Sequence, residues 1–195
     1  VNGSMSDVGT QITLASGAIM QINADGTFGY SINGAYHFLS VGDSDTDSFT
    51  YTLTAGFGLM DTATATFNIT GENDDPVAND DSFSVIVTAT FNGNVLTGVG
   101  SASDDDVDQN DSLSVIDVNG DTGALGTAFA LPSGATVNML SNGTFTYDPS
   151  GAGFSAPTMD SFTYGISDGN GGTDTATVNV TIQPPGNAAP VAQDD

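Results

Sequence analysis

The sequence predicts an all-β chain built from β-sandwich units, and three observations support this expectation. Apolar and polar residues alternate over short runs, as they do in half-buried β-strands. Clusters of Gly, Asn, Asp and Pro separate these runs, and such clusters form tight turns. Several stretches of sequence occur twice, which is typical of a chain made of repeated structural units.

The alternating runs locate the expected strands in chain order. In the first part of the chain, residues 49–53 and 63–69 each place apolar side chains on one face. In the second part, further strands are expected at residues 82–87, 113–118, 136–140, 143–147, 162–166 and 175–182. About seven short strands in roughly 110 residues are typical of an immunoglobulin-like β-sandwich with Greek-key connections.

The repeat has a period of about 115 residues, with small insertions and deletions in loops. The pentapeptide DSFTY begins at Asp47 and again at Asp160. The tetrapeptide DTAT begins at Asp61 and again at Asp174 at the same spacing. The first and second halves therefore carry two versions of one folding unit.

The phase of the repeat predicts where the units begin and end. The tripeptide VNG at Val1 recurs at Val118, in the middle of a unit, and PVANDD at Pro76 recurs as PVAQDD at Pro190. The first unit thus lacks the counterpart of residues 82–117, including expected strands at 82–87 and near 94–96. We expect a partial sandwich over 1–74, a complete one over 75–183, and a linker with the start of another repeat over 184–195. Either the chain is a window of a longer array, or a neighbouring subunit supplies the missing strands.

The charge composition excludes several classes of function. The chain has 24 acidic residues, no Lys or Arg, and a formal net charge of -24. Nucleic acid is excluded as a partner, because phosphate binding requires basic side chains. Without Cys there are no disulfides or thiolate sites, and no apolar run is long enough for membrane insertion. The single histidine, His37, lies in an aromatic and apolar run, so we expect no enzyme.

The junction between the two repeats resembles a known bacterial family. The sequence GENDDPV, which begins at Gly71, resembles the G-x-N-D-x-P-V junction of VCBS and cadherin-like repeats. The stretch from Asp160, DSFTYGISDG followed by GTDTAT, is similar to the C-terminal half of such a repeat. The resemblance implies tandem cadherin-like sandwiches that serve as extender modules in large, calcium-stiffened, RTX-type surface adhesins. The S-D-G-x-G-G turn is replaced by TAGFG over residues 54–58, which departs from the family pattern.

The acidic residues fall in clusters, and closely packed carboxylates repel one another unless a cation lies among them. Ca2+ takes six to eight oxygen ligands with tolerant geometry, so it is the expected cofactor. The expected ligands at the junction are Glu72, Asn73, Asp74, Asp75, Asp80 and Asp81. A second group, in a loop that resembles the D-x-D-x-x-D-x-L type, comprises Asp104, Asp106, Asp108 and Asp111. Further candidates are Asp43, Asp45, Asp47, Asp168 and Asp174.

Turn formation and solvation compete with metal binding as roles for these acids. Asp168 and Asp174 flank a glycine-rich turn, where turn formation accounts for them equally well. The clustered acids as a whole could also be solvated loop residues of a chain adapted to high salt.

The expected function is structural: a calcium-rigidified module of an extracellular or cell-surface adhesin, fibre or matrix protein. Its expected partners are copies of itself or adjacent repeats, joined end to end, because exposed strand edges accept further strands. The alternative is a carbohydrate- or surface-binding module with glycan partners. Exposed aromatic rings on one sheet face would favour that alternative, and the absence of Trp disfavours it.

Overall fold

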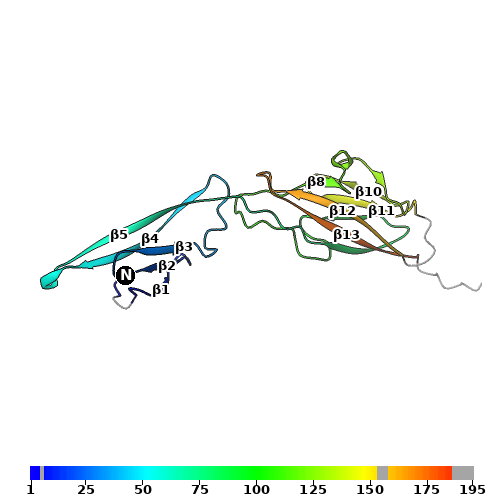
Figure 1. The fold of residues 1–195 in the computed structure, drawn as a ribbon. Coiled ribbons are helices and arrows are strands. Elements are labelled where there is room, and N and C mark those ends of the chain that lie inside the picture. Colours follow the sequence, from blue (N-terminus) through cyan, green and yellow to red (C-terminus); the bar gives the residue numbers. More distant parts are fainter. Residues whose placement is uncertain (5–6, 153–157, 186–195) are drawn as a thin grey trace, which may run out of the picture. The chain divides into compact units, whose positions relative to one another are not determined.

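The computed structural model describes residues 1–4, 7–152 and 158–185, which fold into two compact units (Figure 1). Unit 1 comprises Val1–Asp74 together with Val107–Asn110, and unit 2 comprises Asp75–Asp106 with the chain from Asp111 onward. Residues 190–195, whose sequence repeats that of 76–81, lie outside the described residues. Among the described residues, no helix is long and apolar enough to cross a membrane.

Unit 2 is a sandwich of two four-stranded sheets (Figure 1). The first sheet has the order β6-β13-β12-β8, with strands Asp81–Ile86, Thr173–Gln183, Thr158–Ser167 and Ser114–Val118. The second has the order β7-β11-β10-β9, with strands Phe91–Asn94, Thr144–Asp148, Thr136–Met139 and Phe129–Ala130. A short 3-10 helix, η2, spans Thr122–Ala124. Strand β6 pairs with β13 in parallel, and the other pairs are antiparallel.

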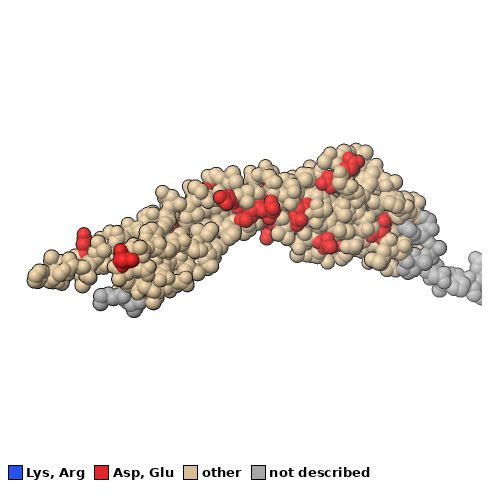
Figure 2. Space-filling view, viewed as in Figure 1, with Lys and Arg blue, Asp and Glu red and all other residues tan. Residues whose placement is uncertain are grey.

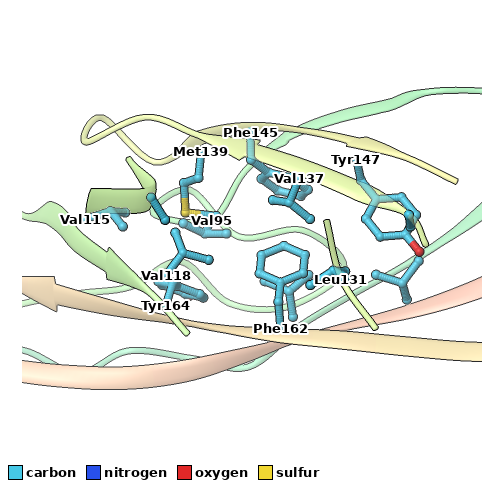
Figure 3. Packing of buried hydrophobic residues seen from close by; sticks show 14 of the residues in the cluster. Val95, Val115, Val118, Leu131, Val137, Met139, Phe145, Tyr147, Phe162 and Tyr164 are labelled. Atoms are coloured by element: carbon cyan, nitrogen blue, oxygen red, sulfur yellow. The ribbon is translucent and has the colours of Figure 1, made fainter. Parts of the chain in front are cut away.

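The core of unit 2 lies between these two sheets (Figure 3). Strand β12 contributes Phe162, Tyr164 and Ile166, and the facing sheet contributes Phe145 and Tyr147. These residues stand at alternate positions because successive side chains of a strand point to opposite faces. The fold class predicted from this alternation, an all-β immunoglobulin-like sandwich, is confirmed.

Unit 1 has a smaller set of strands. A three-stranded sheet has the order β1-β2-β3, with strands Gln11–Thr13, Ile19–Ile22 and Phe28–Ser31. Strands β4 (Ser44–Thr54) and β5 (Met60–Thr70) form an antiparallel ribbon joined by the 3-10 turn η1, Gly56–Gly58. The buried hydrophobic residues of unit 1 are Val1, Leu14, Ala18, Met20, Tyr36, Leu39 and Phe49.

Both units tie their two sheets together with the same polar contact, which we call the Ser-Tyr-Asp clamp. In unit 2, the hydroxyls of Ser133 and Tyr147 donate hydrogen bonds of 2.5 and 2.8 Å to Asp160 Oδ2. In unit 1, Ser16, Tyr30 and Asp47 form the equivalent contact, with distances of 2.7 and 2.9 Å. The repeat seen in the sequence therefore extends to a buried hydrogen-bond network.

One expected strand lies elsewhere. The strand placed near residues 94–96 is β7, and it ends at Asn94. The chain turns there, because Asn94 Oδ1 accepts a hydrogen bond from Thr97 N and Gly98 N donates to Val95 O. The described part of unit 1 contains strands β1 to β5.

Candidate metal centre

Three carboxylates meet in the loop that precedes β8. Asp106, Asp108 and Asp111 each contribute one oxygen atom, and these atoms all lie within 4.8 Å of one another. Asp111 Oδ1 accepts a hydrogen bond of 2.9 Å from Asn170 Nδ2. Its other oxygen, Oδ2, is shielded from solvent and has no hydrogen-bond partner among the described residues.

This arrangement fits a calcium ion. Ca2+ binds carboxylate oxygens at about 2.3–2.6 Å, so two ligands on opposite sides of one ion stand roughly 5 Å apart. The chain has no Lys or Arg that could neutralise these carboxylates, and Figure 2 correspondingly shows acidic residues and no basic ones. Asp106, Asp108 and Asp111 would hold the ion, which would supply charge neutralisation and a fixed loop geometry.

Asp104 belongs to a different cluster in unit 2, although it comes from the same acidic stretch. Its carboxylate accepts a hydrogen bond of 2.7 Å from Asn79 N. The hydroxyl of Tyr164 lies 3.1 Å from Asp104 Oδ2 and 3.2 Å from Asp81 Oδ2. Both carboxylates are buried, and a single phenolic proton serves the two of them.

Burial dominates the ionisation of this cluster. It raises the pKa of Asp81 above the usual value, although hydrogen bonds from Val99, Ser101 and Tyr164 oppose the shift. Burial raises the pKa of Asp104 in the same way. The pKa of Tyr164 is raised by burial first and then by the charges of the two carboxylates. In each group, the folded environment therefore shifts the equilibrium toward the protonated form.

Asp168 and Asp174 hold backbone in place. Asp168 accepts hydrogen bonds from the backbone N–H groups of Asn170, Gly171 and Gly172 at 2.7–3.1 Å. Asp174 Oδ2 accepts one of 2.8 Å from Ala78 N, which fixes the segment leading into β6. The contacts of Asp168 are those of a turn-forming residue, whereas Asp174 holds a segment that is distant in the sequence.

The remaining expected ligands at the junction are spread over separate contacts. Asp80 Oδ1 accepts a hydrogen bond of 2.8 Å from Thr177 N. Asn73 Nδ2 donates to Asp74 O, and Asp74 Oδ2 lies 3.3 Å from His37 Nδ1. Glu72 and Asp75 are exposed. The close group of carboxylates found among the described residues includes none of these side chains.

The three expected calcium ligands at the start of β4 also take part in separate contacts. Asp43 Oδ2 accepts a hydrogen bond of 2.8 Å from Asn110 Nδ2, and the exposed Asp45 bonds to the adjacent Thr46 N. Asp47 is buried in the Ser-Tyr-Asp clamp. Burial opposes ionisation of Asp47, but hydrogen bonds from Ser16 and Tyr30 outweigh it and lower its pKa.

Two groups of functional side chains were not predicted from the sequence. Tyr164 and Tyr147 follow the apolar alternation of their strands, so they resemble ordinary core residues. The signal for the clamp was nonetheless present, because the tripeptide SGA begins at Ser16 and again at Ser133. Tyr164 and Asp81 lie in the repeated stretches DSFTY and PVANDD, but neither stretch indicates that these two residues meet Asp104.

The fold and this loop define the chain as an acidic, all-β repeat module of the cadherin-like kind. The family model of the bacterial cadherin-like domain matches residues 73–184, more than half of the chain. The chain therefore belongs to the bacterial cadherin-like domain family, whose members are typically extracellular.

Two further comparisons, with curated proteins and with solved structures, give no information on function. The comparison with curated proteins finds no match. Among solved structures, the chain is similar to an endo-fucoidan hydrolase of glycoside hydrolase family 107, with 16% identity and a TM-score of 0.35. That match covers 90% of this chain and 23% of the hydrolase chain.

Proposed function

We propose that the chain is a calcium-stabilised structural module of an extracellular adhesin, fibre or matrix protein, with no catalytic role. The observation that supports this proposal is the group of Asp106, Asp108 and Asp111 within a cadherin-like chain. A bound cation would offset the repulsion between these carboxylates. The family's extracellular setting is one in which calcium is abundant.

Calcium should stabilise the folded chain by mass action, because the unfolded chain does not hold the three carboxylates together. Calcium at 100 times its dissociation constant would add about 2.7 kcal/mol to the free energy of unfolding. Thermal melts in chelator and in millimolar calcium measure this effect. We expect the melting temperature to rise with calcium, and coincident curves would contradict the proposal.

A pair of variants ties the effect to the loop. Asp111→Asn keeps an oxygen for the hydrogen bond from Asn170 but places an amide N–H₂ where the shielded Oδ2 lies. Asp45→Asn removes the same charge from an exposed side chain that bonds only to Thr46. We expect the calcium-dependent shift in melting temperature to shrink in Asp111→Asn and to persist in Asp45→Asn. Equal calcium-dependent shifts in the two variants would contradict the assignment of this loop as the calcium site.

We also propose that these units associate with copies of themselves or with adjacent repeats. The family match over residues 73–184 supports this, because the sequence carries two versions of one folding unit in tandem. Sedimentation velocity with and without calcium measures the association. Calcium should promote it by screening the net charge of -24.

The alternative of a carbohydrate-binding module would require exposed rings side by side. Among the described residues, the exposed phenylalanines are Phe28 on β3 and Phe57 in the β4–β5 turn. Phe28 packs edge-on against Phe67 and Phe49, with ring centroids 5.8 and 6.4 Å apart, and these neighbouring rings are half-buried and buried, respectively. We therefore propose the structural role in preference to glycan binding.

A further inference from the structure

The side chain of Asn170 connects the turn between β12 and β13 to the loop that precedes β8. Its Nδ2 atom donates a hydrogen bond of 2.9 Å to Asp111 Oδ1. Asn170 is exposed, and both residues belong to unit 2. One exposed amide therefore joins two segments of unit 2 that are distant in the sequence.

Asp168 fixes the conformation of this turn from within. Its side chain is 4% exposed, and Oδ1 accepts hydrogen bonds from the backbone N–H groups of Asn170, Gly171 and Gly172 at 2.7, 3.0 and 3.1 Å. A Cβ atom on Gly172 would overlap Asp168 Oδ2, so only glycine lets the backbone approach the carboxylate this closely. Because three successive amides share one acceptor, main-chain contacts set the position of Asn170.

The hydrogen bond from Asn170 distinguishes the two oxygens of Asp111. Oδ1 accepts the amide N–H, whereas Oδ2 is shielded from solvent and has no hydrogen-bond partner among the described residues. One oxygen of Asp111 lies within 4.8 Å of an oxygen of Asp106 and of one of Asp108. A side chain that is already held in place need not be ordered when an ion binds, and this preorganisation favours binding.

The equivalent turn of unit 1 lacks both side chains. By the repeat correspondence, Ala55 and Phe57 stand at the positions of Asp168 and Asn170. Neither side chain of this pair can donate or accept a hydrogen bond. Strands β4 and β5 nevertheless form a complete antiparallel ribbon around this turn. Formation of the hairpin therefore does not account for the contact that Asn170 makes with Asp111 in unit 2.

We propose that Asn170 is a positioning residue for calcium: it holds Asp111 so that Oδ2 remains available to the ion. The β12–β13 turn then sets the calcium affinity of the loop that precedes β8. This inference rests on the proposed calcium-stabilised function and adds a residue that lies outside the group of carboxylates. Loss of a hydrogen-bonded neighbour of a metal ligand typically weakens metal binding about 10–100-fold. The coupling is reciprocal, so calcium must stabilise the turn by the same factor by which the turn raises calcium affinity.

A matched pair of variants of the whole chain tests the effect on affinity. Asn170→Ala removes the Nδ2 donor and keeps the backbone N–H that bonds to Asp168. Asn92→Ala removes another exposed asparagine, whose side chain also makes a hydrogen bond of 2.9 Å, to Thr146 on the other sheet. In calorimetric titrations with calcium chloride, we expect Kd to rise about tenfold or more in Asn170→Ala and to stay at the parent value in Asn92→Ala. Melting temperatures in chelator should be equal for the two variants, because each loses one exposed hydrogen bond.

A double-mutant cycle tests whether Asn170 acts through Asp111. Asp111→Asn removes the carboxylate that Asn170 holds. Adding Asn170→Ala to that variant should therefore change Kd by less than about twofold. A second loss as large as that of the single variant would show that Asn170 acts independently of Asp111, and it would refute the inference.

Hydrogen exchange gives a second measurement that uses the parent chain. Saturating calcium should slow exchange of the backbone amides of residues 170–172 by about tenfold, the factor expected for the affinity. The amides of residues 55–58 in the equivalent turn of unit 1 serve as an internal control and should show no such change. In Asn170→Ala, the calcium-dependent slowing at residues 170–172 should disappear.

Equal Kd values for Asn170→Ala and Asn92→Ala would overturn the inference, and so would exchange at residues 170–172 that calcium leaves unchanged. A melting temperature in chelator that falls in Asn170→Ala alone, without a change in Kd, would assign the side chain a purely structural role and would also overturn it. In each of these cases, calcium binding by the parent chain would leave the proposed function standing. A parent chain that binds no calcium would remove both.

Discussion

Truncation of one phenylalanine in each unit tests how burial sets the contribution of a ring to stability. The tripeptide GTF begins at Gly26 and again at Gly143, so Phe28 and Phe145 occupy equivalent positions of the repeat. Phe145→Ala removes a ring that is 3% exposed and packs against Phe83, Phe91 and Phe162 at centroid distances of 5.7–6.0 Å. Deletion of a buried phenylalanine ring costs about 3–5 kcal/mol. Phe28→Ala removes the equivalent ring in unit 1, which is 55% exposed. With less than half of that ring withdrawn from water, its loss should cost only about 1–2 kcal/mol.

Hydrogen exchange followed by mass spectrometry measures the two units separately in one chain, because each unit reports its own opening free energy through its own amides. We expect Phe145→Ala to lower the opening free energy of unit 2 by about 3–5 kcal/mol and to leave unit 1 unchanged. Phe28→Ala should affect only unit 1, and less. Equal losses in the two units would refute this reasoning, because Phe28 is far more exposed than Phe145.

Three other perturbations follow from the same contacts. Burial raises the pKa of Asp81, so the stability that its protonated form contributes is complete below the ordinary pKa and is lost as the pH rises through the raised value. In urea melts with chelator, the free energy of unfolding should therefore fall less between acidic and neutral pH in Asp81→Asn than in the parent chain. Gly100→Ala should lower the free energy of unfolding in urea melts by about 3 kcal/mol or more, because its Cβ would overlap Ser82 O. Gly169 also has a positive φ but faces open space, so Gly169→Ala should cost only about 1–2 kcal/mol. Equal costs would contradict the steric argument. A fragment of residues 1–74 should show no cooperative thermal transition by circular dichroism, and a sharp transition would indicate a self-sufficient unit.

Much of the fold could be predicted from the sequence because the strands of unit 2 follow a strict alternation. Val178, Val180 and Ile182 are all fully buried on one face of β13, as a period of two requires. Strands β1, β2, β3 and β9 were not predicted, because a run of two to four residues carries little or no periodicity. The strand expected near residues 94–96 was placed too late in the sequence, because the apolar residue Val95 is buried although it lies just beyond the end of β7.

The candidate site was only partly predictable. The spacing of Asp106, Asp108 and Asp111 within one loop brings their oxygens together through local backbone alone, so the sequence suffices. Asp81, Asp104 and Tyr164 come together through contacts between segments that are distant in the sequence. The positions of the acidic residues in the sequence do not indicate such contacts. The same holds for Asp47, whose partners Ser16 and Tyr30 lie far from it in the sequence.

The parallel pairing of β6 with β13 has a mechanical consequence for unit 2. These are the first and last strands of the unit, and Asp81 pairs with Val178 at one end while Ile86 pairs with Gln183 at the other. Tension applied between the chain before β6 and the chain after β13 therefore runs along both strands in opposite senses. The ladder hydrogen bonds lie across that direction, so the load is shared by all of them at once and they must break together. An antiparallel pair pulled from one end would open one bond at a time, and unit 2 is expected to resist extension far better than such a hairpin.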